Sequence, residues 1–529
     1  MRARTRRAAS CALAVAVLGL AVALPATAPP PGAGAAAPAR YVTGWIPNWS
    51  NSAVVEGTRA ISGGSDALFA EVSPFGFSAV GAGTIATSGS EANLTAAVSA
   101  LRARGLPVLP SITDGTGRLV MAGILANPAT RTQHVQTIRN LVASRGYDGI
   151  DLDYEGFAFS DGRASWATTR PNWAAFVEEL GAALHADGKL LAVTVPPIWS
   201  GGSAGYTVYA WPEMLPHIDR LRLMVYDWSV GSPGPVSPLW WQADVISYVT
   251  SVVPVDQRSK VQIGVNAYGR SWATVTSGTC PAGASLGTVG VQMESAPAIA
   301  AAQGVTPVRD ASGEMRFTYD VSFTGAGSGA TPPPTRPPPT SRANTTDPIS
   351  TARLAPALRL ANGGTVTCTV RRTVYFPDEF TIVQRTNAVI AAGLSGIAIW
   401  ALGYETPALW GPLSGIDVPR GPGGPAPEGA LDAASISGAG VVVSGWALDP
   451  EFDLPIAITV SVTGASGTVT SGPIMARSIR SDLTAYPSRT HGFMAGVGIA
   501  AQPGATVCVH ARGFGVAAGS ATLIDCLPV

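Results

Sequence analysis

Charged residues are scarce in this 529-residue chain, and neither sign dominates. Only 13% of the residues are charged, and 34 basic side chains are balanced by 34 acidic ones. This balance gives no support to a nucleic acid or an anionic membrane surface as a partner. Histidine is also sparse, with five residues, and none lies in the motifs described below. We therefore expect no metal and no histidine-based triad. We also expect no cofactor, and we expect a monomer.

Long apolar runs are confined to the N-terminus. Residues 1–39 have the pattern of a secretory signal peptide: four arginines precede an apolar run at residues 8–24, and small residues and prolines follow. The cleavage site stays open between Ala28 and the later Ala37 or Ala39. No later run is long and apolar enough to span a membrane. We expect a secreted protein, either free outside the cell or associated with the cell wall.

Cysteine is the third rarity. Apart from Cys11 in the predicted signal peptide, the chain has four cysteines. An even number of cysteines in an oxidising compartment indicates disulfides. We predict that Cys280 pairs with Cys368 and that Cys508 pairs with Cys526.

Short apolar runs alternate with helix-like segments from residue 40 to about residue 415. This alternation is typical of βα units and a parallel sheet. Eight such runs are present, which is the number that a (β/α)8 TIM barrel requires, so we predict an α/β fold of this class. The predicted strands cover residues 41–46, 68–72, 107–112, 149–154, 190–195, 221–226, 261–267 and 396–400.

The most informative stretch is DGIDLDYE, residues 148–155, on the fourth predicted strand. Acidic and apolar residues alternate in it, which is the period of a β-strand. Asp151, Asp153 and Glu155 therefore form one column of carboxylates, roughly 6 to 7 Å apart. Neighbouring charges and partial burial favour the protonated form of at least one member, which suits a general acid. The alternatives are a solvated strand edge or a carboxylate cluster that holds a divalent cation.

This stretch resembles the D-G-x-D-x-D-x-E signature of glycoside hydrolase family 18, the chitinase-like family, with every fixed position filled. Met224, Tyr226 and Asp227 are similar to the M-x-Y-D motif of the same family. Trp400 ends the eighth predicted strand, which resembles the family's last strand, whose terminal tryptophan lies beneath the reacting sugar. The resemblance implies that Met224, Asp227 and Trp400 contact the substrate.

The resemblance also implies a retaining glycosidase in which the substrate's own acetamido group is the nucleophile. Glu155 would protonate the glycosidic oxygen and later activate water. Asp153 would orient the acetamido nitrogen, and Asp151 would tune Asp153 through a shared proton or a hydrogen bond. Tyr226 would hydrogen-bond the acetamido group, and Asp227 would contact the sugar or help to distort it.

Such a mechanism needs an N-acetylated sugar on the non-reducing side of the β-1,4 bond that is cut. The expected partner is therefore a polysaccharide: chitin, chitooligosaccharides or peptidoglycan, with N-glycans also in reach. The sequence leaves chitin and peptidoglycan open. The alternative function is a catalytically silent, chitinase-like carbohydrate-binding protein, a lectin of the cell wall, but an intact Glu155 argues against it.

Two segments depart from the barrel pattern. Residues from about 271 to 376 form an insertion between the seventh and eighth strands, which resembles the small α+β insertion of one branch of the family. Its Gly- and Pro-rich stretch at residues 325–347 is expected to be disordered. After a linker at residues 416–429, residues 430–529 show short alternating runs that predict an all-β, sandwich-like accessory domain. Parts of it resemble repeats that are appended to secreted actinobacterial wall enzymes.

Overall fold

The structure is a computed structural model of the chain. It describes residues 40–62, 65–326, 364–416, 427–438, 440–449, 452–465, 467–472, 474–476, 478–484, 491–512 and 521–529. The predicted signal peptide, most of the stretch expected to be disordered and most of the predicted linker lie outside these residues.

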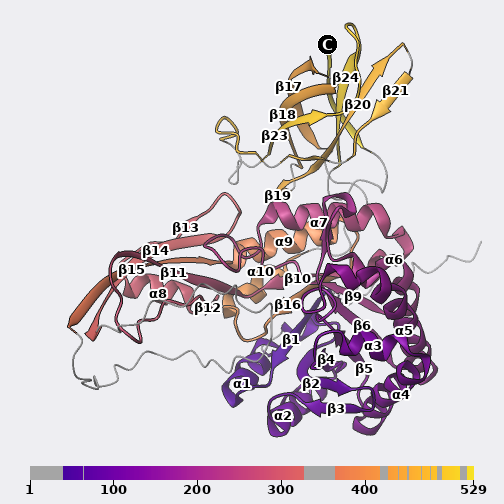
Figure 1. The fold of residues 1–529 in the computed structure, drawn as a ribbon, viewed down its shortest axis with the longest axis vertical. Helices are drawn as coiled ribbons and strands as arrows, with labels where there is room; N and C mark the ends of the chain where they lie inside the picture. Colours follow the sequence, from indigo (N-terminus) through magenta and orange to yellow (C-terminus); the bar gives the residue numbers. More distant parts are fainter. Residues whose placement is uncertain are drawn as a thin grey trace, which may run out of the picture. The chain divides into compact units, whose positions relative to one another are not determined.

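Eight parallel strands close into a barrel (Figure 1). Their order is β1-β16-β10-β9-β6-β5-β4-β2, and β2 pairs with β1 to complete the ring. The predicted (β/α)8 fold class is therefore confirmed. The barrel strands are β1 (Val42–Pro47), β2 (Ser73–Gly81), β4 (Ser111–Asp114), β5 (Gly149–Asp153), β6 (Leu190–Val195), β9 (Arg220–Leu223), β10 (Val261–Asn266) and β16 (Gly396–Trp400). A short strand, β3 (Thr84–Thr87), pairs antiparallel with β2.

Three predicted strand positions were wrong in their bounds. The second strand was expected at residues 68–72, but this segment contributes only isolated bridges and β2 begins at Ser73. The third strand begins at Ser111 instead of residue 107, and the sixth ends at Leu223 instead of residue 226. The apolar pattern reports burial, which extends past the hydrogen-bonded ladder: Phe69, Val108 and Val225 are all fully buried outside the strands.

Helices cover the outside of the barrel (Figure 1). They are α1 (Asn51–Ala60), α2 (Glu91–Arg102), α3 (Val120–Ala126), α4 (Pro128–Arg145), α5 (Trp166–Ala186), α6 (Trp211–Met214), α7 (Leu239–Val252), α9 (Glu379–Ala391) and α10 (Trp410–Ser414). A two-stranded hairpin, β7 (Ile198–Trp199) and β8 (Ala204–Gly205), follows β6.

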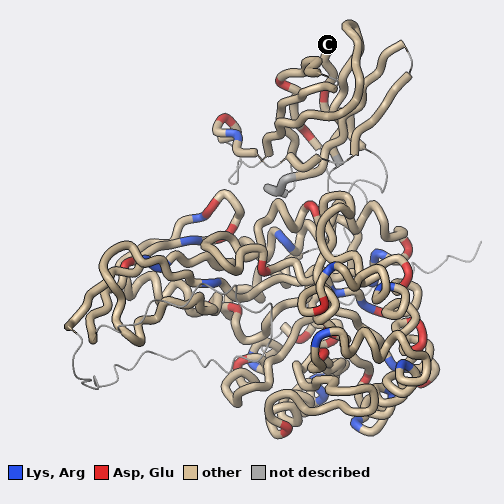
Figure 2. Tube along the Cα trace, in the orientation of Figure 1, with Lys and Arg blue, Asp and Glu red and all other residues tan. Residues whose placement is uncertain are grey.

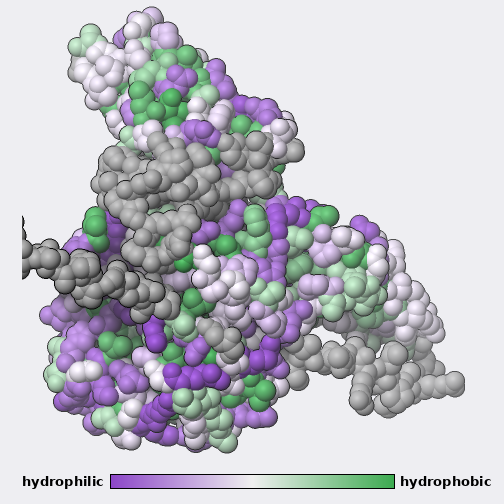
Figure 3. Space-filling model, turned by 180° about the vertical axis from the view of Figure 1, so that it is seen from behind, coloured by the Kyte–Doolittle hydropathy of each residue, from purple (hydrophilic) through white to green (hydrophobic). Residues whose placement is uncertain are grey.

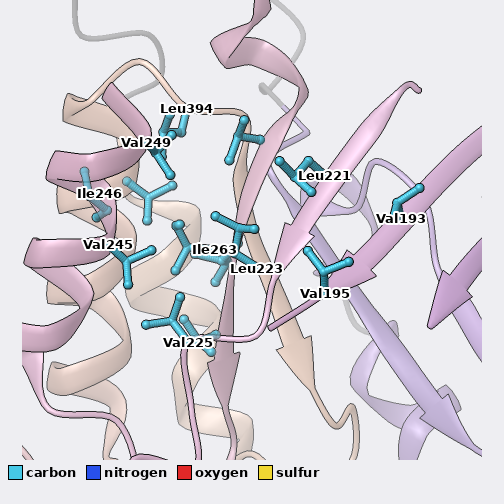
Figure 4. Close-up of a cluster of buried hydrophobic side chains, with 14 of the residues drawn as sticks. Val193, Val195, Leu221, Leu223, Val225, Val245, Ile246, Val249, Ile263 and Leu394 are labelled. Carbon is cyan, nitrogen blue, oxygen red and sulfur yellow. The ribbon is translucent and has the colours of Figure 1, made fainter. Parts of the chain in front are cut away.

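Apolar side chains fill the space between strands and helices. Figure 4 shows one such region, where strand residues such as Leu223 and Ile263 lie opposite Val245 and Val249 of α7. All four side chains are fully buried. Burial of a side chain of this size contributes roughly 1.5–3 kcal/mol, so the outward faces of the barrel strands are a main source of stability. The inward faces are left for polar side chains at the site.

The insertion between β10 and β16 is an antiparallel sheet with one helix beside it (Figure 1). Its elements are β11 (Tyr268–Gly278), β12 (Val289–Gln292), α8 (Ala296–Ala302), β13 (Val308–Arg309), β14 (Met315–Ala326) and β15 (Thr365–Phe376). The strand order is β12-β11-β15-β14-β13. A disulfide joins Cys280 to Cys368, as predicted. Because β11 begins at Tyr268, directly after β10, the insertion starts at the mouth of the barrel.

The C-terminal segment contains two antiparallel sheets. One consists of β17 (Glu428–Ser437), β18 (Gly440–Asp449), β19 (Phe452–Pro455) and β23 (Gly492–Val497). The other consists of β20 (Ala457–Gly464), β21 (Gly467–Thr470), β22 (Ile474–Met475), β24 (Thr506–Arg512) and β25 (Thr522–Pro528). Cys508 and Cys526 face each other across β24 and β25 and form the second predicted disulfide. We propose that these sheets make up an accessory domain.

The surface of the described residues is mixed in character. Basic and acidic side chains are interspersed along the chain trace (Figure 2). Hydrophilic and hydrophobic residues likewise alternate over the face shown in Figure 3. None of the helices in the described part of the chain combines the length and the apolar character that a membrane span needs.

Candidate active site

The carboxylate column lies on the fourth barrel strand and directly after it. Asp151 and Asp153 belong to β5, and Glu155 follows two residues beyond its end. The alternating apolar residues face the surrounding helices, and the hydroxyl group of Tyr154 hydrogen-bonds Nε2 of His134 on α4 at 2.7 Å. Because parallel strands end at the same edge of the barrel, this column points toward the mouth where enzymes of this fold carry their sites.

Asp151 is fully buried and held by donors from several strands. Its Oδ2 accepts hydrogen bonds from Nε1 of Trp45 at 2.8 Å and from Oγ of Ser111 at 2.6 Å. Its Oδ1 accepts a hydrogen bond from Oγ1 of Thr194 at 2.7 Å. The guanidinium of Arg222 forms an ion pair with Oδ2 at 3.3 Å. Both oxygens are therefore occupied, and the Asp151 side chain is fixed in one orientation.

Asp153 differs sharply from Asp151. Its side chain is also buried, with 5% exposed, but Oδ1 accepts no hydrogen bond from the described residues. Burial raises the pKa of Asp153 well above its usual range, and the charges of Glu155 and Asp151 raise it further. The surroundings of Asp153 thus favour its neutral form, and Oδ1 is a buried oxygen without a partner among the described residues. Leaving such an oxygen unsatisfied costs about 1–3 kcal/mol, which a ligand donor would recover.

Glu155 is half-buried at the end of the column. Burial raises the pKa values of Tyr206 and Tyr209, and the negative charge of Glu155 raises them further, as it does for Asp153. The hydroxyl group of Tyr209 donates to the backbone carbonyl of Tyr154 at 2.7 Å, which fixes the backbone just before Glu155. Glu155 therefore lies at the mouth with tyrosine side chains close by, the most accessible acid of the three.

Tyr226 follows β9 and faces the same region. Its pKa is raised well above the usual range by burial first, then by Tyr268 and by the charges of Asp153 and Glu155. Its hydroxyl group therefore keeps its proton and can donate a hydrogen bond. The predicted members of the column and the M-x-Y-D motif are thus brought together at one end of the barrel.

Asp227 stands in the left-handed region, with a φ of 66°. Its Oδ1 accepts a hydrogen bond from the hydroxyl group of Tyr268 and another from NH2 of Arg270 at 2.7 Å. Both partners belong to β11, the first strand of the insertion. The insertion thus holds the carboxylate that follows the sixth strand.

Trp400 ends β16 and lies among other aromatic rings. Its ring centroid is 5.9 Å from that of Trp45, 5.0 Å from that of Phe75 and 6.2 Å from that of Trp49. Trp400 is half-buried, and Trp49 is 37% exposed. Since Trp45 also bonds to Asp151, Trp400 lies beside the carboxylate column. Met224 is half-buried, and its backbone N–H donates to Val195 at 3.0 Å.

The sequence did not reveal several polar partners at the site. Trp45, Thr194 and Arg222 contact Asp151, and Tyr268 and Arg270 contact Asp227. Arg222 carried a signal, because an arginine in an apolar strand needs a buried acidic partner. The other four carried none that separates them from ordinary core or surface residues. Within the described residues, no group of three or more His, Cys, Asp or Glu side chains is arranged to hold a metal ion.

The structure is a closed (β/α)8 barrel with acids at the carboxyl end of its fourth strand, which is the end where enzymes of this fold carry their active sites. The model of "Glycosyl hydrolases family 18" matches residues 75–405. This chain belongs to that family.

Several known proteins are similar to this chain. The Bacillus subtilis protein named as a sporulation-specific glycosylase, YdhD, is 30% identical over 189 residues, which cover 35% of this chain and 42% of that protein. The chain spans less than half the length of the curated relatives that it matches. Among solved structures, a chitinase from Chromobacterium violaceum has a TM-score of 0.52 at 22% identity, covering 71% of this chain and 98% of that one.

A second solved structure has the same fold. The spore cortex-lytic enzyme SleL of Bacillus megaterium has a TM-score of 0.51 at 16% identity and covers 73% of this chain and 76% of that one. At this level of sequence identity, the similarity shows a shared fold and says nothing about the reaction.

Proposed function

We propose that this chain is a secreted, retaining glycosidase that hydrolyses β-1,4 bonds after N-acetylated sugars by substrate-assisted catalysis. The observation that carries the proposal is the gradation along one column. Asp151 is saturated with donors, Asp153 is a neutral acid with an unpartnered oxygen, and Glu155 is accessible at the mouth. Three acids in three environments suit three different tasks.

In the first step, Glu155 donates its proton to the glycosidic oxygen. The acetamido oxygen of the substrate attacks the anomeric carbon as the bond to the leaving sugar breaks, which gives an oxazolinium intermediate. Oδ1 of Asp153, which has no partner among the described residues, accepts the acetamido N–H and stabilises the positive charge that develops there. No protein nucleophile is needed.

In the second step, Glu155 is a carboxylate and acts as the general base. It takes a proton from water, whose oxygen attacks the anomeric carbon and opens the intermediate. Both steps invert the anomeric carbon, so the product keeps the configuration of the substrate. The protonated Asp153 can share its proton with the Glu155 carboxylate between the two steps.

The remaining residues would hold the sugar. The hydroxyl group of Tyr226 keeps its proton and donates to the acetamido oxygen, which orients this oxygen for attack. Asp227 accepts from a sugar hydroxyl group with its second oxygen, because Oδ1 is already held by Tyr268 and Arg270. The half-buried ring of Trp400 stacks against the apolar face of the pyranose.

The substrate class follows from the mechanism, which requires N-acetylated sugars. Chitin and peptidoglycan both contain N-acetylglucosamine. The similar proteins include some named as chitinases and others named for sporulation or cortex lysis, which supports both candidates.

The test is product analysis by mass spectrometry after incubation with chitohexaose and, separately, with purified peptidoglycan. The intact protein is expected to release N-acetylglucosamine-containing products from at least one substrate. Glu155→Gln is expected to lose about 10²–10⁴-fold in rate, because general acid–base catalysis contributes this much. Glu178→Gln, on the exposed side of α5, is the matched control and should retain full activity.

Two outcomes would contradict the proposal. Unchanged hydrolysis by Glu155→Gln would show that another group is the acid. Binding of either glycan without any product from the intact protein would favour the carbohydrate-binding alternative.

A further inference from the structure

A buried arginine lies beneath the carboxylate column. Arg222 on β9 is fully buried, and NH1 pairs with Oδ2 of Asp151 at 3.3 Å while donating to Oγ of Ser73 at 2.7 Å. NH2 donates to Oε1 of Glu71 at 3.3 Å, and Nε donates to Oε1 of Gln262 at 3.2 Å. One guanidinium thus connects Asp151 on β5 to an acid that precedes β2, two strands along the barrel.

The cluster is balanced in charge. Glu71 is 2% exposed and also accepts from Nε of Arg220 at 2.9 Å. Two guanidinium groups therefore face two buried carboxylates, and of the two cations Arg222 is fully buried whereas Arg220 is partly exposed. Because a buried charge without a partner is costly, each member depends on the others to stay ionised. Arg222 is the member that contacts both acids.

The other groups around Asp151 are neutral donors. They come from three strands: Trp45 on β1, Ser111 on β4 and Thr194 on β6. The remaining acidic neighbour is Asp153 on β5, whose pKa is raised by burial first, then by the charge of Glu155 and by that of Asp151. Two acids two residues apart along one strand would by themselves share a proton, because neighbouring like charges disfavour double ionisation. A guanidinium stays protonated at all working pH values, so its contact breaks this symmetry.

We propose that Arg222 is a positioning residue that keeps Asp151 ionised and fixed, so that the proton of the Asp151–Asp153 pair remains on Asp153. This inference rests on the proposed function and deepens it. Asp151 then does not accept the proton of Asp153. Once Glu155 has protonated the leaving group, Glu155 is the carboxylate with which Asp153 can share its proton. Asp153 therefore shares its proton with Glu155 and not with Asp151.

The test compares pH profiles of kcat/KM for the intact protein and three variants. Arg222→Met removes the cation, so the acid limb should move to higher pH by about 1 unit. Arg222→Lys keeps a positive charge and should restore most of the acid limb. Glu71→Gln removes the competing carboxylate and should move the acid limb to lower pH. Shifts in opposite directions are not expected from a residue that only fills space.

Arg131→Met is the control for lost stability. This variant removes an ion pair on the outer helices, in which Nε of Arg131 lies 2.7 Å from Oε1 of Glu179. It should leave the acid limb of the pH profile unchanged. An acid limb that stays unchanged in Arg222→Met, with activity reduced equally at all pH values, would overturn the proposal. If Arg222→Met does not fold, Arg222→Lys and Glu71→Gln carry the test, and equal profiles for these two would overturn it.

A second readout does not depend on turnover. Titration of [γ-13C]aspartate-labelled protein by NMR, assigned with Asp151→Asn and Asp153→Asn, reports the two carboxyl groups directly. We expect Asp151 to be ionised and Asp153 protonated at pH 6. If this pattern holds in a protein that cleaves no glycan, the proposed function fails and the role of Arg222 stands. Equal protonation of the two groups in the intact protein would overturn the role of Arg222.

Discussion

At the scale of single residues, two aspartates on one strand have opposite properties because their surroundings differ. Both oxygens of Asp151 accept hydrogen bonds, and one of them also meets a guanidinium. Asp153 is nearly as buried, yet one oxygen has no partner among the described residues. Hydrogen bonds and an opposite charge favour the ionised form, whereas burial alone favours the neutral form. The surroundings therefore separate the two acids: both oxygens of Asp151 are held by donors, whereas burial raises the pKa of Asp153 well above its usual range.

This separation predicts that Asp153→Asn stabilises the fold at neutral pH while it lowers hydrolysis. The pKa of Asp153 is raised in the folded state, so the unfolded chain releases this proton first as the pH rises. The folded state therefore loses stability from about pH 4 upward, by about 1.4 kcal/mol for each pH unit between the two pKa values. Asparagine removes this loss.

Thermal unfolding of both proteins at pH 4 and at pH 7 measures the effect. The Tm of Asp153→Asn should exceed that of the intact protein at pH 7, and the difference should shrink at pH 4. A difference of the same size at both pH values would show that Asp153 is not held neutral by its surroundings.

The sequence predicts the acidic column but not its partners, for a physical reason. Alternation is a local pattern, visible within eight residues. The donors to Asp151 come from other strands: Trp45 is 106 residues away in the chain and Thr194 is 43 residues away. Such contacts depend on how the strands align around the barrel, and no local pattern contains that information.

At the scale of elements, the insertion completes the site that the barrel begins. Strand β11 supplies Tyr268 and Arg270, which hold Asp227 in its left-handed conformation. Aspartate tolerates this conformation better than most residues, but it still needs support from its neighbours.

Arg270→Met is predicted to lower kcat/KM by about 10- to 100-fold, because hydrogen bonds to a charged group contribute about 1.5–3 kcal/mol. Arg371→Met is the matched control on β15 of the same sheet. Its ion pair with Asp320 is exposed, with 53% and 44% of the two side chains accessible, and such pairs contribute little. Steady-state kinetics on the cleaved glycan should therefore separate the two variants, and equal values for both would contradict this role of β11.

The loop after β16 carries another buried acid. Glu405 is 1% exposed, and burial raises its pKa to about 7. Its Oε2 accepts a hydrogen bond from the backbone N–H of Gly403 at 2.7 Å. The amide oxygen of a glutamine can accept the same hydrogen bond. The folded state binds the proton more tightly than the unfolded chain, so its stability falls as the pH rises from about 4 through 7.

Glu405→Gln should therefore be more stable than the intact protein at pH 8, on the order of 1 to 3 kcal/mol, and the gain should vanish near pH 4. Urea unfolding at the two pH values measures the gain. A variant that is less stable at pH 8 would show that the carboxylate is favoured in the folded loop.

Element bounds were predicted less well than element number. The barrel count of eight was correct, but the bounds of the second, third and sixth strands were displaced. Met224 and Tyr226 consequently follow β9 instead of lying on it, and Asp227 comes directly after them. Their side chains are placed by the turn after the strand, and alternation along a strand does not describe that turn.

At the scale of the whole molecule, the fold class followed from the repeating pattern of apolar runs and helices, which any βα barrel must show. Both disulfide pairs were also predicted correctly. The insertion was predicted from its resemblance to the small α+β insertion of one branch of the family, but its strand order was not, because the strand pairing joins residues far apart in the chain. The proposed reaction would depend on all these parts together, since the acids, Tyr226 and Trp400 come from different parts of the barrel.

The stereochemistry of the product tests this account most directly. Proton NMR during the first minutes of hydrolysis, on chitohexaose or on whichever glycan is cleaved, shows which anomer forms before mutarotation mixes the two. Substrate-assisted catalysis with Glu155 as acid and base predicts the β-anomer first. An initial α-anomer would mean that water attacks in a single inverting step, which would contradict the roles assigned to Asp153 and Glu155.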